Sequence, residues 1–210
     1  MATLILDIET VGFDSDNKDS LSPYKGQIIS LGVYDLERDL GSVYFVGNSA
    51  DESFEDDNFS YKSRSEKELL EDFWETVSRY DVLVSFNGRA FDVPFLYIRS
   101  IALDVKPTVE IAKNRYVTKQ SAPYHVDLFD EFSFYGNVTK KPSLAVLCEA
   151  LGVDNPKLHM KGEDITDFFL EKQFIEIAKY NAKDIVAITK LYKKWLKNLA
   201  PSAFLNAVEL

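Results

Sequence analysis

The sequence predicts an α/β fold in which helices flank a mixed β-sheet, formed as a single domain over residues 1–210. Three observations lead to this prediction. Apolar runs typical of strands come first, strand and helix patterns alternate in the middle of the chain, and helical patterns dominate its end. The length suits one domain with a sizeable core, and no linker or repeat divides the sequence.

The strand predictions rest on short apolar runs. Residues 3–8 form a nearly uninterrupted run, which predicts a central strand covered on both faces. Residues 27–35 and 42–46 predict two further strands, with Gly41 at the turn between them. Residues 82–86 predict a short buried strand.

The helix predictions rest on capping patterns and helical spacing. Ser65 and Glu68 form a capping-box pattern, which predicts a helix from there to about Arg79. Its inward side chains are expected to be Leu69, Leu70, Phe73 and Trp74. Three further helices are predicted at residues 92–101, 143–151 and 174–199.

The composition is that of a globular protein, with 46% hydrophobic and 28% charged residues. No apolar run approaches the ~18 residues that cross a bilayer, and the N-terminal residues lack the basic segment of a signal peptide. The one cysteine, Cys148, lies in an apolar helical pattern, which excludes an internal disulfide framework and indicates a buried thiol. We therefore expect a cytoplasmic protein that does not enter a membrane.

The formal net charge of −10 argues against tight, nonspecific binding of long duplexes, because neutralising phosphates requires a basic surface. The charges are uneven. Residues 51–57 are strongly acidic, whereas residues 106–119 carry Lys106, Lys113, Arg115 and Lys119 against Glu110 alone. This distribution is compatible with a protein that grips one strand end.

Acidic residues stand out at two places, Asp7 with Glu9 and then Asp92. Asp7 and Glu9 stand two positions apart at the end of the first apolar run, so on a strand both carboxylates project from the same face. Such a pair favours a bound cation, although both acids could instead be solvated at the end of the strand. Asp92 precedes Val93-Pro94 at a predicted helix start, where it could cap the helix, bind a cation, or do both.

Asp184 is the most informative acid, because it interrupts the apolar stripe of the last predicted helix. That stripe consists of Ile177, Tyr180, Asp184, Ile188, Leu191 and Trp195. A carboxylate among apolar side chains is costly to bury without a partner. The partner could be a metal ion, the hydroxyl of Tyr180 one turn earlier, or a lysine elsewhere.

Together, three segments carry a resemblance to a known family. They are Leu6-Asp7-Ile8-Glu9-Thr10, Asn87-Gly88-Arg89-Ala90-Phe91-Asp92 and Tyr180-Asn181-Ala182-Lys183-Asp184. In this order they resemble the three motifs of the DEDD exonuclease superfamily, and the Tyr-x-x-x-Asp spacing resembles its tyrosine subgroup. Residues 87–96, 125–128 and 141–144 are most similar to stand-alone relatives of the proofreading domain of family-B DNA polymerases.

The resemblance implies an RNase H-like fold and a 3′→5′ exonuclease that acts on single-stranded ends, DNA rather than RNA, and releases nucleoside 5′-monophosphates. It implies two divalent cations, Mg²⁺ or Mn²⁺, held by Asp7, Glu9, Asp92 and Asp184; oxygen ligands without cysteine suit such ions. Asp7 would bridge both ions, and Asp92 would act mainly through the second. Tyr180 would orient the attacking water. Substrate contacts are expected from Thr10, Asn87 and Phe91.

Several alternatives stay open. Asn87 could contact the terminal nucleotide or only hold the turn. His125 and Asp127 could support the site, but we favour a structural pair at a strand end. Residues 203–205 could dock on an unidentified protein partner or, as we favour, on their own domain. The whole protein could act on RNA or short oligonucleotides instead, or be a catalytically silent module that binds nucleic acid or protein, although the retained acids argue against silence.

Overall fold

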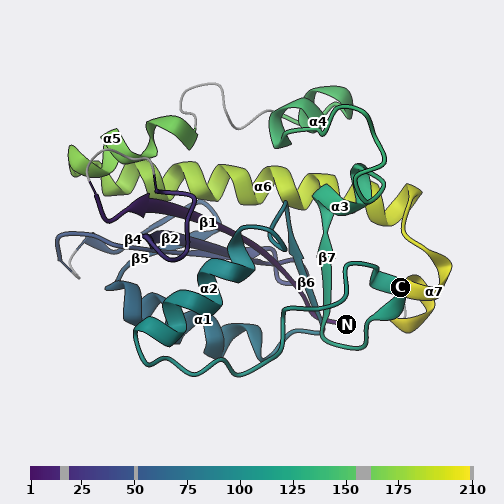
Figure 1. The fold of residues 1–210 in the computed structure, drawn as a ribbon, viewed down its shortest axis with the longest axis horizontal. Coiled ribbons are helices and arrows are strands. Elements are labelled where there is room, and N and C mark those ends of the chain that lie inside the picture. The colour runs from purple at the N-terminus through teal and green to yellow at the C-terminus, as the bar shows by residue number, and fades with distance from the viewer. Residues whose placement is uncertain (15–18, 50–51, 155–161, 209–210) are drawn as a thin grey trace.

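A computed structural model describes all residues except 15–18, 50–51, 155–161 and 209–210 (Figure 1). In the described part, seven strands form one sheet in the order β4-β5-β3-β2-β1-β6-β7. The strands are β1 (Thr3–Gly12), β2 (Gly26–Asp35), β3 (Leu40–Phe45), β4 (Phe54–Asp56), β5 (Phe59–Ser63), β6 (Val82–Ser85) and β7 (Tyr124–Asp127).

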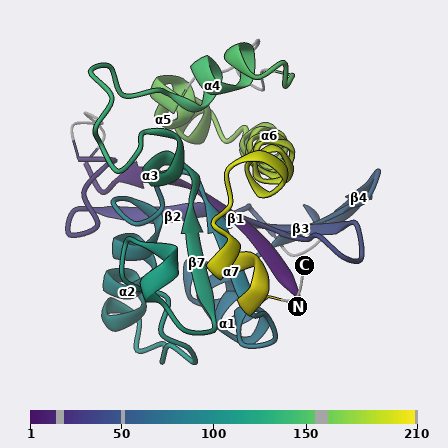
Figure 2. The same ribbon diagram turned by 90° about the vertical axis from the view of Figure 1, so that its right-hand side faces the viewer.

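Helices cover both faces of the sheet. They are α1 (Glu66–Val77), α2 (Asp92–Ala102), α3 (Leu128–Phe132), α4 (Leu144–Ala150), α5 (Ile165–Leu170), α6 (Phe174–Asn198) and α7 (Ser202–Ala207), with short 3₁₀ turns at Val117–Lys119 and Gly162–Asp164. Helix α6 crosses one face, with α4 and α5 beside it, and α1 and α2 cover the other (Figures 1 and 2). None of the helices in the described ranges is both long and apolar enough to span a membrane.

Strand β1 lies at the centre of the sheet and organises it. It pairs antiparallel with β2 and parallel with β6, so the sheet is mixed. The two faces of β1 differ because successive side chains alternate. Leu4, Leu6 and Ile8 pack toward α1 and α2, whereas Ile5 belongs to the core beneath α6. Asp7 and Glu9 continue the face of Ile5 and therefore point toward α6.

Most predicted elements are present, and the predicted mixed α/β sheet is confirmed. The capping box at Ser65 and Glu68 forms, and the four predicted inward side chains of α1 are buried. Gly152 follows α4 with a φ of +62°, a conformation that favours glycine at a helix end. Cys148 is buried, as predicted.

One local prediction is wrong, and one open alternative is excluded. Gly41 lies within β3, and the turn before it contains Asp39 at a φ of 58°. A Cβ on Gly41 would lie 2.2 Å from the ring of Phe59, so close packing explains this glycine. Asp92 is already inside α2, whose N-cap residue is Phe91 with no side-chain cap, so Asp92 does not act as the cap.

Candidate active site

The candidate site lies where the second half of β1 faces α6. Asp7 and Glu9 are half-buried there, and they stand opposite Gly32 and Ser30 of β2. The β1–β2 register shifts immediately after Glu9, between Glu9 and Thr10. The two acids therefore occupy the last regularly paired positions of β1 before this irregularity, with the apolar run Leu4-Ile5-Leu6 anchoring them in the sheet.

Helix α6 brings a third acid to this pair. Asp184 is only 5% exposed, because it lies on the face of α6 that packs on β1 and β2. One carboxylate oxygen from each of Asp7, Glu9 and Asp184 lies within 4.8 Å of the others. Like charges at this separation repel each other strongly, and a divalent cation between them would remove that repulsion. We call these three residues the carboxylate group.

Asn181, which the sequence argument did not single out, orients one member of the carboxylate group. Its side-chain amide donates to Oδ2 of Asp7 at 2.7 Å, and its carbonyl oxygen accepts from the hydroxyl of Ser30 at 3.2 Å. Asn181 is fully buried. Gly32 makes room for it, because a Cβ there would lie 2.5 Å from Oδ1 of Asn181 and 2.9 Å from Ile185.

Two sequence features could have revealed this contact. Asn181 is a polar residue on the buried side of α6, three positions before Asp184 and hence close to it on the helix surface. Gly32 interrupts the apolar pattern of β2, and a glycine inside a strand often marks a close approach of another element.

Tyr180 lies one helical turn before Asp184 and is 3% exposed. Its hydroxyl is hydrogen-bonded to Asp184. Burial raises the pKa of Tyr180 far above its usual range, and the negative charges of Asp184, Glu9 and Asp7 raise it further. The phenol therefore stays protonated at any physiological pH and is available as a hydrogen-bond donor beside the carboxylate group.

Asp92 lies near the carboxylate group in the fold but is not one of its members. It is 2% exposed at the first turn of α2. Burial and, to a smaller degree, the charge of Asp127 raise the pKa of Asp92 to about 8, although the backbone N–H groups of Asp92 and Ile8 oppose this rise. Among the described residues, its Oδ1 atom has no hydrogen-bond partner. The hydrogen bond to Ile8 ties Asp92 to the same strand that carries Asp7 and Glu9.

The loop before Asp92 is fixed by Asp127. The carboxylate of Asp127 accepts backbone N–H groups from Asn87 at 2.8 Å, Arg89 at 2.9 Å and Phe129 at 3.0 Å. Asn87 has a φ of 62°, so its backbone shapes this turn. Asp127 thus has a structural role, which agrees with the favoured interpretation.

His125 is also structural. Its Nε2 atom lies 2.8 Å from the hydroxyl of Ser85, and both residues are buried. Burial, together with the nearby positive charge of Arg89, lowers the pKa of His125 to about 3. The imidazole is therefore neutral at neutral pH and serves as a packed polar partner of Ser85.

The remaining predicted residues take the following places. Thr10 is buried, and its hydroxyl donates to the carbonyl of Ser20 at 2.6 Å, which ties the connection after β1 to the strand. Phe91 is half-buried, with its ring 5.1 Å from that of Phe95. Phe204 packs against Trp195 and Tyr124, so the C-terminal segment docks on its own domain, as favoured.

The residues of the carboxylate group fit hard divalent cations. Three carboxylates offer oxygen ligands only, and oxygen is the donor that Mg²⁺ and Mn²⁺ prefer. The group lies in the second half of β1, where Asp7 and Glu9 are half-buried and keep part of their surface open for the waters that Mg²⁺ retains.

Comparison with solved structures defines the class of fold. The family B DNA polymerase of the hyperthermophilic archaeon Pyrobaculum calidifontis superposes with a TM-score of 0.66 at 20% identity, covering 93% of this chain and 24% of the polymerase. At that identity the likeness concerns the fold, and it confirms the RNase H-like α/β architecture that the sequence motifs implied.

Sequence comparison then places the chain in a family. Residues 38–204 match the family described as a predicted 3′-5′ exonuclease related to the exonuclease domain of PolB. The chain therefore belongs to this family of 3′-5′ exonucleases. The matched range contains Asp92, Tyr180 and Asp184, whereas Asp7 and Glu9 precede it.

Individual relatives agree with this placement. DNA polymerase 1 of Sulfolobus acidocaldarius is 31% identical over 139 residues, 60% of this chain and 15% of the polymerase. The DNA polymerase of Autographa californica nuclear polyhedrosis virus is 22% identical over 161 residues, 68% of this chain and 16% of the polymerase. The chain thus spans less than a fifth of the length of these relatives.

Proposed function

We propose that residues 1–210 form a single-domain, metal-dependent exonuclease that removes nucleotides from the 3′ end of single-stranded DNA and releases nucleoside 5′-monophosphates. The observation that carries the proposal is the carboxylate group. Asp7 and Glu9 come from a strand, Asp184 comes from a helix far away in the sequence, and their oxygens meet within 4.8 Å. Exonuclease domains of this family use divalent metals, and a group of this kind is suited to hold them.

The chain's own residues would divide the work as follows. Asp7, Glu9 and Asp184 would hold two divalent cations, Mg²⁺ or Mn²⁺, with Asp92 contributing to the second through intervening waters. When bound, the two ions would supply charge stabilisation and water activation for in-line displacement at phosphorus. The amide of Asn181 donates a hydrogen bond to Oδ2 of Asp7 and so fixes the rotamer of this side chain. The other carboxylate oxygen of Asp7, Oδ1, is thereby held in one orientation.

Tyr180 would act as a hydrogen-bond donor next to the carboxylate group, the role implied by the tyrosine subgroup. Its phenol stays protonated because it is buried and lies near three carboxylates, and the proton that it now directs to Asp184 would turn to a water or a phosphate oxygen if a cation occupied that carboxylate. Substrate contacts from Thr10, Asn87 and Phe91 stay part of the proposal. For Thr10 the hydroxyl proton is already used by Ser20, so that contact would involve its backbone or its oxygen as an acceptor.

The test uses end-labelled single strands of DNA and RNA of equal length. We expect degradation from the 3′ end with Mn²⁺ or Mg²⁺ and none in excess chelator. A bulky group on the 3′-hydroxyl should stop digestion, whereas the same group on the 5′ end should not. Preferential digestion of RNA would favour an exoribonuclease, cleavage of a closed circle would show an endonuclease, and binding without digestion would favour a silent module.

A further inference from the structure

The solvent face of α6 carries a row of lysines that has no role in the candidate site. Its members are Lys179, Lys183, Lys190, Lys193, Lys194 and Lys197, and we call them the lysine stripe. All are exposed except Lys179, which is half-buried with 40% of its side chain accessible. Their spacing of three, four and seven residues places them on one side of the helix.

The protein itself neutralises little of this charge. Lys190 lies 2.6 Å from Asp154, and Lys179 lies 3.9 Å from Asp56. Both pairs are solvent-exposed, and exposed pairs of this kind exchange readily with other anions. Within the described ranges, the other four lysines of the stripe form no ion pair.

The positive charges of the lysine stripe destabilise α6, the helix that carries them. Lys179 and Lys183 stand four residues apart, as do Lys190 and Lys194, and like charges at this spacing destabilise a helix. Besides the buried Asp184, the acid within α6 is Glu176 at its first turn. In a protein with a formal net charge of −10, this self-repelling row of positive charge calls for an external polyanion.

The basic stretch at residues 106–119, which the sequence alone singled out, is different. Lys113 lies 3.7 Å from Glu110, and Arg115 lies 2.5 Å from Asp130. Arg115 therefore supports the loop around the buried Asp130, although 44% of its own side chain is accessible. Lys106 and Lys119 stay exposed, but they do not form a continuous row.

The stripe begins beside the candidate site and leads away from it. Lys183 adjoins Asp184 in the sequence and lies about 100° from it around the helix, so Lys183 is exposed while Asp184 is buried. From Lys183 to Lys197 the helix rises about 21 Å at ~1.5 Å per residue, and its diameter is about 10–12 Å. A strand that crosses the helix and then follows it spans about 30 Å, so only a strand of several nucleotides reaches the far end of the stripe.

We propose that the lysine stripe binds the phosphate backbone of a single strand whose 3′ end occupies the carboxylate group. The inference rests on the proposed function for the identity of the strand and adds to it a second contact surface. Because the stripe reaches phosphates far from the 3′ end, it distinguishes long strands from short ones. A short oligonucleotide uses the carboxylate group alone.

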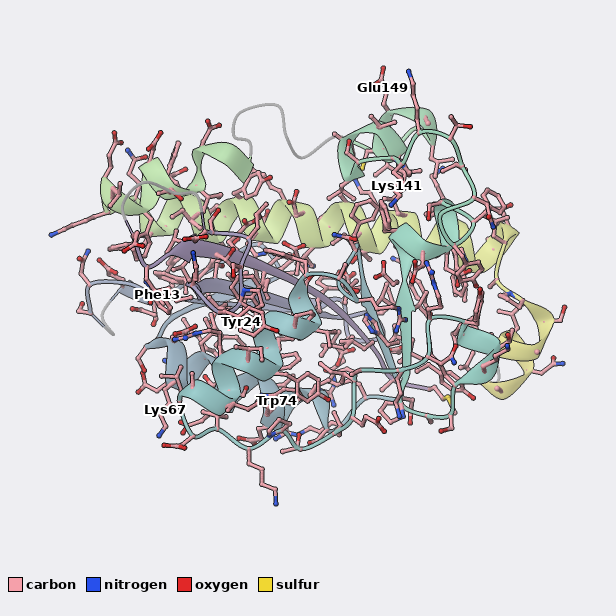
Figure 3. The ribbon with its side chains drawn as sticks, in the orientation of Figure 1. Phe13, Tyr24, Lys67, Trp74, Lys141 and Glu149 are labelled. Carbon is pink, nitrogen blue, oxygen red and sulfur yellow. The ribbon has the colours of Figure 1, made fainter. Side chains whose placement is uncertain are left out.

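The test compares two triple variants that change the net charge equally. The first is Lys183→Gln, Lys194→Gln and Lys197→Gln in the stripe. The matched control is Lys67→Gln, Lys106→Gln and Lys119→Gln, which are exposed elsewhere. Lys67 lies on α1, across the sheet from α6 (Figure 3). Binding of a 5-mer and of a 30-mer of single-stranded DNA is measured as a function of salt with Mn²⁺ present, in the Asp7→Asn background so that no strand is degraded.

We expect the stripe variant to bind the 30-mer at least about tenfold more weakly at low salt. The slope of log affinity against log salt should fall by about 2, since each phosphate contact contributes about 0.7 for a single strand. Binding of the 5-mer should not change, and the control should match the parent protein with both strands.

Three results would overturn the inference: an unchanged 30-mer affinity in the stripe variant, an equal loss in the control, or a parent protein that binds no strand. The proposed function is decided separately by metal-dependent digestion of the 5-mer by the wild-type protein. Digestion without a stripe effect removes only the stripe, whereas stripe-dependent binding without any digestion removes only the exonuclease.

Discussion

The protein contains two clusters of acidic side chains that differ in what surrounds them. In the first, the carboxylate group, the donors described above are neutral: the amide of Asn181 reaches Asp7, and the phenol of Tyr180 reaches Asp184. In the second, which we call the Asp127 network, Asp127 accepts three backbone N–H groups. Its other members are Asp130, Arg89, Arg115 and His125.

This difference teaches how to separate a site from a scaffold. The Asp127 network matches its acids with guanidinium groups and backbone donors, so its charge is balanced within the fold. The carboxylate group gathers three acids whose oxygens lie within 4.8 Å of one another, an arrangement that a divalent cation would balance. Acidity alone does not mark the site; the kind of donor around each acid does.

The strongest test of this comparison is Asp184→Asn, which removes one charge but keeps volume and hydrogen bonding. We expect activity to fall to background, because a metal ligand is lost, while metal-free stability holds or rises, because repulsion is relieved. Digestion rate and urea unfolding are measured on the same preparation, with the exposed Asp104→Asn as the matched control. A variant that unfolds would mean that Asp184 belongs to a structural pair.

Tyr180→Phe removes one donor from the edge of the carboxylate group and keeps the ring. We expect a rate loss of roughly tenfold to a thousandfold with little change in substrate affinity, because the hydroxyl acts on the water and not on the strand. Tyr192→Phe is the control, since Tyr192 is buried on the same helix but away from the acids. A single-turnover rate equal to that of wild type would remove Tyr180 from the site.

Asn181→Ala deletes the amide that orients Asp7. Loss of a group that holds a metal ligand typically costs about 10- to 100-fold in metal affinity or activity. We expect the half-activating Mn²⁺ concentration to rise within that range, and the Mn²⁺-induced increase in melting temperature to shrink in parallel. Ser30→Ala, which removes only the outer hydrogen bond, should have a smaller effect. Equal metal affinity in wild type and Asn181→Ala would contradict the positioning role.

In the Asp127 network the same type of substitution should affect folding instead of chemistry. Asp127→Asn places an NH₂ group against one of three backbone donors, so we expect a loss of about 1–3 kcal/mol in unfolding free energy. Activity per folded molecule should stay near that of wild type. A selective loss of turnover with normal stability would instead assign Asp127 to the chemistry.

The effect of His125 appears only when the pH is lowered. Burial lowers its pKa to about 3 in the folded protein, compared with about 6.5 when exposed. Between these values the unfolded chain binds more protons, so this residue lowers stability as pH falls. Lowering the pH from 7 to 4.5 should reduce the unfolding free energy of both proteins. The reduction should be smaller in His125→Gln than in wild type, by up to about 3 kcal/mol. Parallel pH profiles for the two proteins would mean that His125 does not titrate as inferred.

Local signals explain which parts of the fold could be predicted from the sequence. The capping box of α1, the apolar run of β1 and the helical stripe of α6 are each encoded within a few turns or residues. Strands β4, β5 and β7 escaped prediction because they are only three to five residues long and are held by distant partners. Gly41 was misplaced because its neighbour Phe59 comes from such a distant strand.

The same distinction applies to the candidate site. Alternation along β1 and periodicity along α6 place Asp7, Glu9 and Asp184 on facing surfaces, whereas their role as ligands stays a proposal. Asn181 was missed because its contact joins a helix to a distant strand, so its two sequence signals, a polar residue on an apolar helix face and Gly32 inside β2, have to be combined. The lysine stripe was visible in the sequence, but only the structure showed that residues 106–119 use much of their charge internally.

Gly32 of β2 has a consequence for ion selection. Gly32 is not among the proposed metal ligands, but the absence of a side chain there allows Asn181 and Ile185 to approach the sheet. The separation between the acids of β1 and the acid of α6 is therefore set by a residue that never touches an ion. Mg²⁺ demands near-ideal octahedral geometry, so a wedge of one methyl group at this position would penalise the smaller and stricter ion more than a larger, more tolerant one. A substitution at Gly32 would then change which ionic radius the site accepts without changing any of the ligands.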